Sequence, residues 1–75
     1  MSTQTELNLI GVFFPICLMK CKSKLNDIQS GDTMEVLIAD PEVVKDLEKI
    51  IGRSKDRITH RVEESDHYRL RILKG

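Results

Sequence analysis

The spacing of apolar residues changes from strand-like to helical within the first third of the chain. From Glu6 to Phe13 the residues alternate between two sides, which predicts a strand. One side holds Leu7, Leu9 and Gly11, and the other holds Glu6, Asn8 and Ile10. From Pro15 to Ile28 the spacing predicts an amphipathic helix, which the polar segment 29–32 ends. Its apolar arc consists of Cys17, Leu18, Cys21, Leu25 and Ile28.

The pattern of apolar and polar residues in the middle of the chain predicts a second strand and a second helix. The segment from Thr33 to Ala39 is apolar on both sides, as expected for a central strand that pairs on both edges. Asp40 can cap the next helix, Pro41 suits its first position, and Glu42 lies near the positive end of its dipole. Gly52 is expected to end this helix in the left-handed conformation. The predicted buried stripe is Val43, Val44, Leu47, Ile50 and Ile51, and the predicted solvent face is Lys45, Asp46, Glu48 and Lys49.

The last third of the chain predicts a hairpin around a polar turn at residues 63–66. Before the turn, Ile58, His60 and Val62 alternate with Thr59 and Arg61; after it, Tyr68, Leu70 and Ile72 alternate with Arg69 and Arg71. The element order is therefore βαβαββ, and right-handed crossovers place both helices on one face of the sheet. The sequence predicts an α/β (α+β) two-layer sandwich that forms a single domain over residues 1–75.

Composition and charge narrow the function classes. The chain has 75 residues, with 12 basic and 12 acidic side chains, so no net charge attracts it to nucleic acid. Its start is polar, without a signal-peptide pattern, and no apolar run reaches the length of a membrane span. Cys17 and Cys21 are too close in sequence for a structural disulfide to gain much. We therefore expect reduced thiols and a cytoplasmic location, without membrane contact.

Motifs of common enzyme classes are missing from the sequence. It contains no Gly-x-Gly-x-x-Gly, no Walker-type loop and no Cys-x-x-Cys. The two cysteines lie on a predicted helix, whereas His60 and His67 lie in the predicted hairpin, at spacings that no common zinc site uses. We therefore predict neither a metal nor a cofactor.

The junction of the first strand and first helix is the candidate site. A thiolate at Cys17 would lie in the first helical turn, where free N–H groups and the helix dipole favour an anion. Alternatively, Cys17 and Cys21 act as small buried hydrophobes on the apolar arc. The periodicity favours burial, and more strongly for Cys21, which lies one turn deeper.

The same junction carries a family resemblance. The aligned residues are Gly11, Phe14, Pro15, Cys17 and Lys20, followed by Ser30-Gly31-Asp32 before the second strand and Asp40-Pro41 at the second helix. These positions resemble the Gly-x-x-Cys-Pro-x-Pro motif and later landmarks of the TusA/SirA-like small sulfur carriers, over nearly the whole chain. The resemblance implies a four-stranded mixed sheet whose last strand is antiparallel to the others. It also implies persulfide relay to an acceptor, as in tRNA thiolation or cofactor synthesis.

The chain departs from that motif at two positions. Phe14 stands where the family has its persulfide-bearing cysteine, and Cys17 stands where the family has its second proline. One hypothesis is a sulfurtransferase-like carrier in which Cys17 replaces the missing cysteine. The alternative is a non-catalytic paralogue that acts as a protein-interaction or regulatory module. Whether the protein is an enzyme depends on which hypothesis holds.

A partner surface is predicted at the same junction. The residues Phe14, Pro15, Ile16, Met19 and Lys20 would form it, because Ile16 and Met19 lie opposite the apolar arc. Alternatively, Phe14 turns inward and fills the small core. The resemblance implies a protein partner such as a cysteine desulfurase or another sulfurtransferase.

A second charged surface is predicted on the sheet face away from the helices. It would hold Arg57, Arg61, Arg69 and Arg71. Tyr68 alternates to the other face, so this surface lacks the aromatic side chains on which RNA-binding sheets stack bases. We therefore predict a solvated face whose arginines pair with Glu35 and its neighbours, and nucleic acid is not predicted as a direct ligand.

Overall fold

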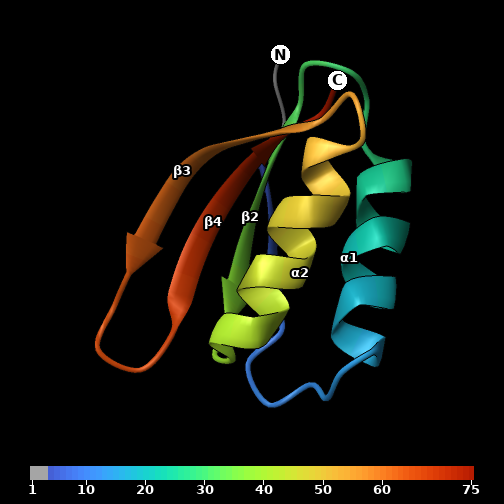
Figure 1. The fold of residues 1–75 in the computed structure, drawn as a ribbon. Helices are drawn as coiled ribbons and strands as arrows, with labels where there is room; N and C mark the ends of the chain where they lie inside the picture. The colour runs from blue at the N-terminus through green and yellow to red at the C-terminus, as the bar shows by residue number, and fades with distance from the viewer. Residues whose placement is uncertain (1–3) are drawn as a thin grey trace.

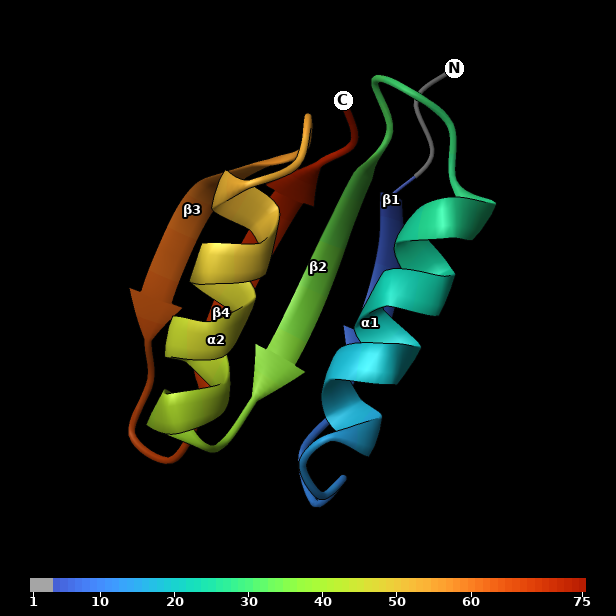
Figure 2. The same ribbon diagram turned by 45° about the vertical axis from the view of Figure 1, so that its right-hand side comes forward.

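The computed structural model describes residues 4–75, which form one sheet covered on one face by two helices (Figures 1 and 2). The elements are β1 (Gln4–Asn8), α1 (Ile16–Asp27), β2 (Thr33–Ile38), α2 (Pro41–Gly52), β3 (Arg57–Glu63) and β4 (Tyr68–Leu73). The strand order is β1-β2-β4-β3, with β1 parallel to β2, and β4 antiparallel to β2 and β3. The predicted two-layer βαβαββ sandwich and its mixed four-stranded sheet are confirmed. Neither helix within residues 4–75 has the length and apolar character needed to cross a membrane.

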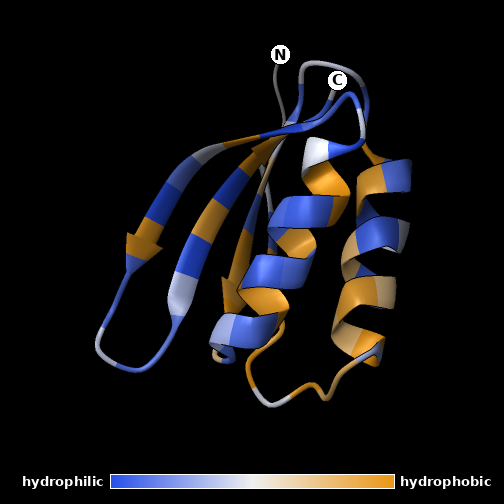
Figure 3. Ribbon diagram, in the orientation of Figure 1, coloured by the Kyte–Doolittle hydropathy of each residue, from blue (hydrophilic) through white to orange (hydrophobic). Residues whose placement is uncertain are grey.

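The core lies between the sheet and the two helices. The central strand β2 contributes Met34, Val36 and Ile38, which β4 meets with Ile72, Leu70 and Tyr68 at the paired positions. The other edge of β2 pairs with β1, so the predicted pairing of this strand on both edges is confirmed. Figure 3 shows apolar and polar residues alternating along β4, as expected when one face of a strand is buried and the other is not.

The helix α2 begins as the sequence predicts. The backbone N–H of Glu42 donates to Asp40 Oδ1 at 2.9 Å, and Pro41 occupies the first helical position. Two details of the prediction are wrong. Ile50 is 44% exposed because it lies at the groove between the helices rather than under α2. Gly52 has no positive φ and is the last helical residue; Arg53 is the C-cap, and its N–H donates to the carbonyl of Ile50.

The strand β1 is shorter than predicted, because it ends at Asn8 rather than Phe13. The side chain of Asn8 accepts the N–H of Ile10 at 3.0 Å, and the N–H of Val12 donates to the carbonyl of Leu9 at 3.1 Å. Gly11 has a φ of 84°, a left-handed conformation that suits glycine. The N–H of Leu9 still donates to the carbonyl of Leu37 in β2 at 2.8 Å, but beyond it these turn contacts replace strand pairing, so residues 9–15 form a loop.

The helix α1 packs on the predicted arc. Cys17, Cys21 and Leu25 are buried, and Leu18 and Ile28 pack against the core. The helix begins at Ile16 rather than Pro15, since the backbone of Pro15 has not yet entered the helix. Figures 1 and 2 show α1 and α2 side by side on the same face, with both N-termini at the same end of the molecule.

A bulge in β3 changes which of its side chains face the helices. Ile58 pairs with Ile72, but the next paired position is His60 opposite Arg71, with a register shift between them. Because one extra residue reverses the alternation, Arg61 lies opposite Leu70, on the helix side of the sheet. There it approaches Glu48 of α2 at 3.6 Å. The prediction that Arg61 shares the outer face with the other arginines is therefore wrong.

Candidate functional site at the start of the first helix

Exposed apolar side chains gather where the loop 9–15 enters α1. We call Phe13, Phe14, Ile16 and Met19 the corner patch. Phe13 is 83% exposed, Phe14 59% and Met19 64%, and Ile16 is also exposed. None of them fills the core. Exposed apolar residues that cluster in this way are typical of a surface that contacts another protein.

The sequence prediction missed Phe13, which is the most exposed large apolar residue among those that the structure describes. The alternating pattern assigned it to a strand. The signal that identifies a loop is the combination of Asn8, which can bond the backbone two residues further on, and Gly11. Pro15 and Lys20, the other two predicted partner residues, are both exposed beside the patch.

The two thiols lie on the core-facing side of α1, whereas Ile16 and Met19 of the corner patch lie on its exposed side. Cys17 is 1% exposed and Cys21 is fully buried, and both are free thiols. Burial, followed by the proximity of Cys17 and Asp56, raises the pKa of the Cys21 thiol to about 12. Cys21 is therefore a neutral thiol at neutral pH, and it packs as a small hydrophobe.

The backbone N–H groups of Cys17 and of the next two residues already have hydrogen-bond partners. The N–H of Cys17 donates to the carbonyl of Phe13 at 3.1 Å, and the next N–H groups, of Leu18 and Met19, both donate to the carbonyl of Pro15. The N-cap residue of α1 is Pro15, which makes no side-chain capping hydrogen bond. The first turn therefore stabilises a Cys17 thiolate less than the sequence suggested, because the N–H of Cys17 itself already has a hydrogen-bond partner.

A cavity of about 200 Å³ lies inside the corner, and Cys17 lines it together with Phe14. Asp40, the capping residue of α2, lines it from the other helix. A second cavity next to it is lined by Phe14 and by carboxylate residues of α2, including Glu42 and Asp46. Phe14 thus lies between the buried thiol of α1 and the acidic start of α2.

The exposed side of α1 is basic. Lys20, Lys22 and Lys24 are its charged residues before Asp27 at the end of the helix. Within residues 4–75, none of these lysines takes part in an ion pair. The corner patch is therefore flanked by positive charge on the α1 side and by carboxylates on the α2 side.

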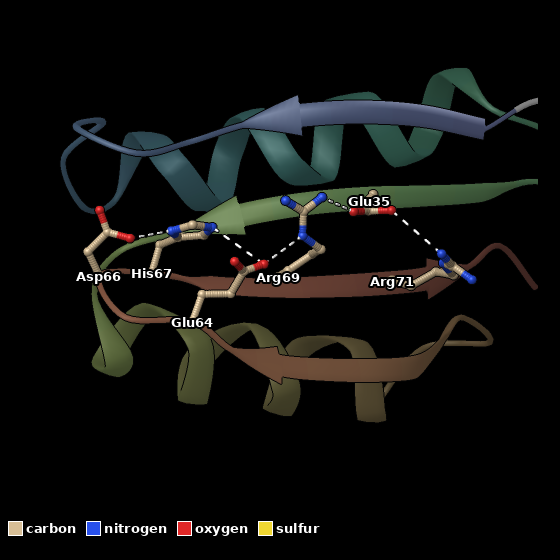
Figure 4. A network of polar contacts seen from close by, with 6 residues as sticks. All are labelled: Glu35, Glu64, Asp66, His67, Arg69 and Arg71. Atoms are coloured by element: carbon tan, nitrogen blue, oxygen red, sulfur yellow. Dashed lines mark hydrogen bonds and ion pairs between the residues drawn. The ribbon is translucent and has the colours of Figure 1, made fainter.

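The outer face of the sheet carries an ion-pair network (Figure 4). Glu35 of β2 is buried there, and its carboxylate accepts a hydrogen bond from Arg69 and lies 3.7 Å from Arg71. These partners lower the pKa of Glu35, the hydrogen bond from Arg69 having the largest effect. Arg69 also bonds Glu64 at 3.0 Å. The predicted pairing of this face with Glu35 is confirmed, although Arg61 lies elsewhere.

Two features of this region bear on ligand binding. Tyr68 pairs with Ile38 and packs against the core, so it does not stack on the outer face. His67 contacts Asp66 at 2.7 Å, whereas His60 lies beside Thr59 on the sheet, away from both cysteines. Among the residues that the structure describes, no three His, Cys, Asp or Glu side chains gather in a way that suits a metal ion.

Taken together, these features define a small α+β sandwich with an exposed apolar corner at the start of its first helix, above two buried thiols. The chain belongs to the TusA family: the family model described as sulfurtransferase TusA matches residues 5–74. A curated relative, the sulfur carrier protein TusA of Allochromatium vinosum, is 28% identical over 70 residues, which are 93% of this chain and 92% of the relative. No solved structure matches the chain. The predicted family resemblance is thereby confirmed.

Proposed function

We propose that this protein acts in sulfur transfer as a docking module, which presents the corner patch to a protein partner and carries no persulfide on its own thiols. The observation that carries this proposal is the contrast between buried thiols and exposed apolar side chains. The thiols of Cys17 and Cys21 are buried, whereas Phe13, Phe14 and Met19 are among the most exposed apolar residues described. A carrier needs a thiol that a partner can reach and that ionises near neutral pH.

The resemblance to the family motif supports the same function. In that resemblance Phe14 stands at the position of the motif cysteine, and a phenylalanine has no thiol that could carry a persulfide. The fold and the exposed corner nevertheless remain, so a partner that recognises this corner in related proteins has a comparable surface to bind. By its chemistry that partner is a cysteine desulfurase or another sulfurtransferase, and we place the encounter in the cytoplasm, where both thiols stay reduced.

A second candidate function is a displaced carrier that uses Cys17. It is favoured by one observation, that Cys17 lines the corner cavity together with Phe14. In that function the Cys17 thiolate attacks the terminal sulfur of a donor persulfide. A sulfur–sulfur bond forms at Cys17, the sulfur–sulfur bond of the donor breaks, and the donor leaves as a thiolate. The bound sulfur then passes to an acceptor, as in tRNA thiolation or cofactor synthesis.

One experiment separates the two functions. The protein is incubated with a cysteine desulfurase and cysteine, and its intact mass and peptides are analysed without reductant. We expect no added sulfur in the natural sequence. Addition of one sulfur atom at Cys17, lost in Cys17→Ser and kept in Cys21→Ser, would establish the displaced carrier and overturn the docking module.

The variant Phe14→Cys serves as the positive control. It restores a thiol at the exposed position of the family motif, on a side chain that the structure places outside the core. We expect it to gain one sulfur under conditions in which the natural protein gains none. If it remains unloaded although folded, the corner is not recognised by the desulfurase, and this partner class is ruled out.

A further inference from the structure

A groove between α1 and α2 continues the exposed apolar surface away from the corner. It has a volume of about 290 Å³, and its walls are mainly apolar. Leu18 and Met19 line it from α1, and Leu47 and Ile50 line it from α2. Met19 belongs to the corner patch as well, so patch and groove form one connected surface. We call this second part the interhelix groove.

The exposure of Ile50 is the unusual feature of this groove. The helical pattern of α2 predicts a buried position, yet 44% of Ile50 is exposed to solvent. The sheet and α1 leave it uncovered, and the described part of the chain supplies no other element to cover it. An apolar groove between two side-by-side helices suits an amphipathic segment that inserts apolar side chains at helical spacing.

The charges around the groove indicate what kind of segment fits. Lys22 lines the groove, and it is exposed and makes no ion pair within residues 4–75. Its neighbours Lys20 and Lys24 add positive charge along the same helix. Asp56, the other charged residue that lines the groove, keeps its negative charge but accepts the N–H of Gly75 at 2.8 Å. Lys22 is therefore the charged groove residue without a side-chain hydrogen bond or ion pair among residues 4–75, and with Lys20 and Lys24 it makes the α1 side of the groove positive.

We propose that the interhelix groove binds an amphipathic, acidic segment of a partner protein, which places apolar side chains on Ile50 and Met19 and a carboxylate on Lys22. This inference rests on the proposed function, since it extends the docking surface of the corner patch. A second copy of the chain is disfavoured as the occupant. In a symmetric dimer both copies use the same surface, so the unpaired lysines of the two α1 helices would face each other.

A peptide selection tests this proposal before the partner protein itself is identified. A displayed library of random peptides is selected on the full-length protein, and the affinity of each enriched peptide is measured by fluorescence anisotropy. We expect enriched peptides with apolar residues at helical spacing and at least one Asp or Glu. Ile50→Ser and Lys22→Glu should each weaken their binding about tenfold, as is typical for losing a central contact.

Matched controls are available on the same chain. Val62 is 48% exposed on the outer sheet face, so Val62→Ser removes a similarly exposed apolar side chain far from the groove. Lys49→Glu reverses an exposed lysine of α2 that does not line the groove. Both controls should bind the peptides as the natural protein does. Enrichment of no peptide, enrichment of basic peptides, or equal loss in controls and groove variants would overturn the proposal.

Two further measurements separate this inference from the proposed function. If the enriched peptides respond to Phe13→Ser but not to Ile50→Ser or Lys22→Glu, the groove proposal fails and docking at the corner stands. If Cys17 accepts sulfur in the desulfurase experiment, the proposed function fails, whereas the peptide result is unaffected. Sedimentation analysis that finds a dimer, converted to a monomer by Ile50→Ser, would identify a second copy as the occupant and overturn the proposal.

Discussion

The two helices cover the same face of the sheet side by side, yet their sequences use different means to hold them there. Helix α2 begins with a side-chain cap at Asp40, a proline at its first position and an acidic residue in its first turn. Three of its charged residues are in ion pairs: Glu42 pairs with Lys45 within the helix, and Glu48 pairs with Arg61 of β3. The N-cap residue of helix α1, Pro15, makes no side-chain capping hydrogen bond, and the first turn of this helix contains no acidic residue.

The exposed sides of the two helices also differ, because that of α1 carries apolar residues and lysines without ion-pair partners in the described part of the chain. Helix α1 leaves Ile16 and Met19 exposed, and its lysines are unpaired within residues 4–75. These features add little to folding but suit contact with another molecule. The comparison indicates that α2 stabilises the domain, whereas α1 combines a buried arc with a surface available for binding. Substitutions in the two helices should therefore have different effects on stability and on binding.

The largest loss of stability is expected from the buried stripe of α2. Leu47 is buried, so Leu47→Ala should lower the free energy of unfolding by about 2 to 5 kcal/mol, through lost burial and the cavity left behind. Ile50→Ala, on the same helix but exposed, should lower it far less. Urea unfolding followed by circular dichroism measures both. Equal losses would mean that Ile50 is part of the core.

Substitutions in the buried arc of α1 should cost less stability than Leu47→Ala does. The double variant Cys17→Ala and Cys21→Ala removes two buried sulfur atoms. It should lower the free energy of unfolding by about 1 to 2 kcal/mol while the secondary structure is retained. The same urea titration measures it. Complete unfolding of the double variant would show that α1 anchors the domain as firmly as α2, which contradicts the comparison.

Alkaline pH should destabilise the protein through the thiol of Cys21. Burial raises the pKa of this thiol from 9.0 to about 12, so the folded state keeps a proton that the unfolded state loses. The stability contribution of the neutral thiol is therefore complete below pH 9.0 and falls as the pH rises toward about 12. Between about pH 7 and about pH 10, the natural protein should lose roughly 1 kcal/mol more than Cys21→Ala does. Identical pH profiles would place Cys21 in contact with solvent.

The helix cap of α2 provides a smaller and more local test. Asp40→Ala removes the acceptor of the Glu42 N–H and should cost about 1 kcal/mol. Asp46→Ala, which removes a carboxylate later in the same helix, is the matched control and should change stability by less than about 0.5 kcal/mol. Thermal unfolding of both variants distinguishes a capping effect from a general loss of negative charge.

The smallest effect on folding is expected at the corner patch. Replacing Ile16 and Met19 with Ser should change the free energy of unfolding by less than about 0.5 kcal/mol for each residue, because both side chains are exposed. The same variant should weaken a pull-down of a sulfurtransferase partner. A large loss of stability would show that α1 needs these residues for packing, and the distinction between the two helices would disappear.

Some features of this protein follow from short stretches of sequence. The triplet Asp40, Pro41 and Glu42 determines where α2 begins, because cap, proline and dipole act within one helical turn. The helical spacing of Cys17 and Cys21 likewise predicts their burial, since one face of α1 must cover the sheet. The residues around Pro15 that resemble the family motif imply the fold, because members of the family share it.

Other features depend on contacts between segments that are distant in the chain. The bulge in β3, which turns Arg61 toward the helices, arises from the pairing of β3 with β4, and strict alternation cannot reveal it. The exposure of Ile50 depends on how far apart α1 and α2 pack, which neither helix encodes alone. Local hydrogen bonds and periodicity thus determine where the helices begin and which faces they bury. The register of the sheet and the spacing of the helices decide which side chains line the groove and remain available to a partner.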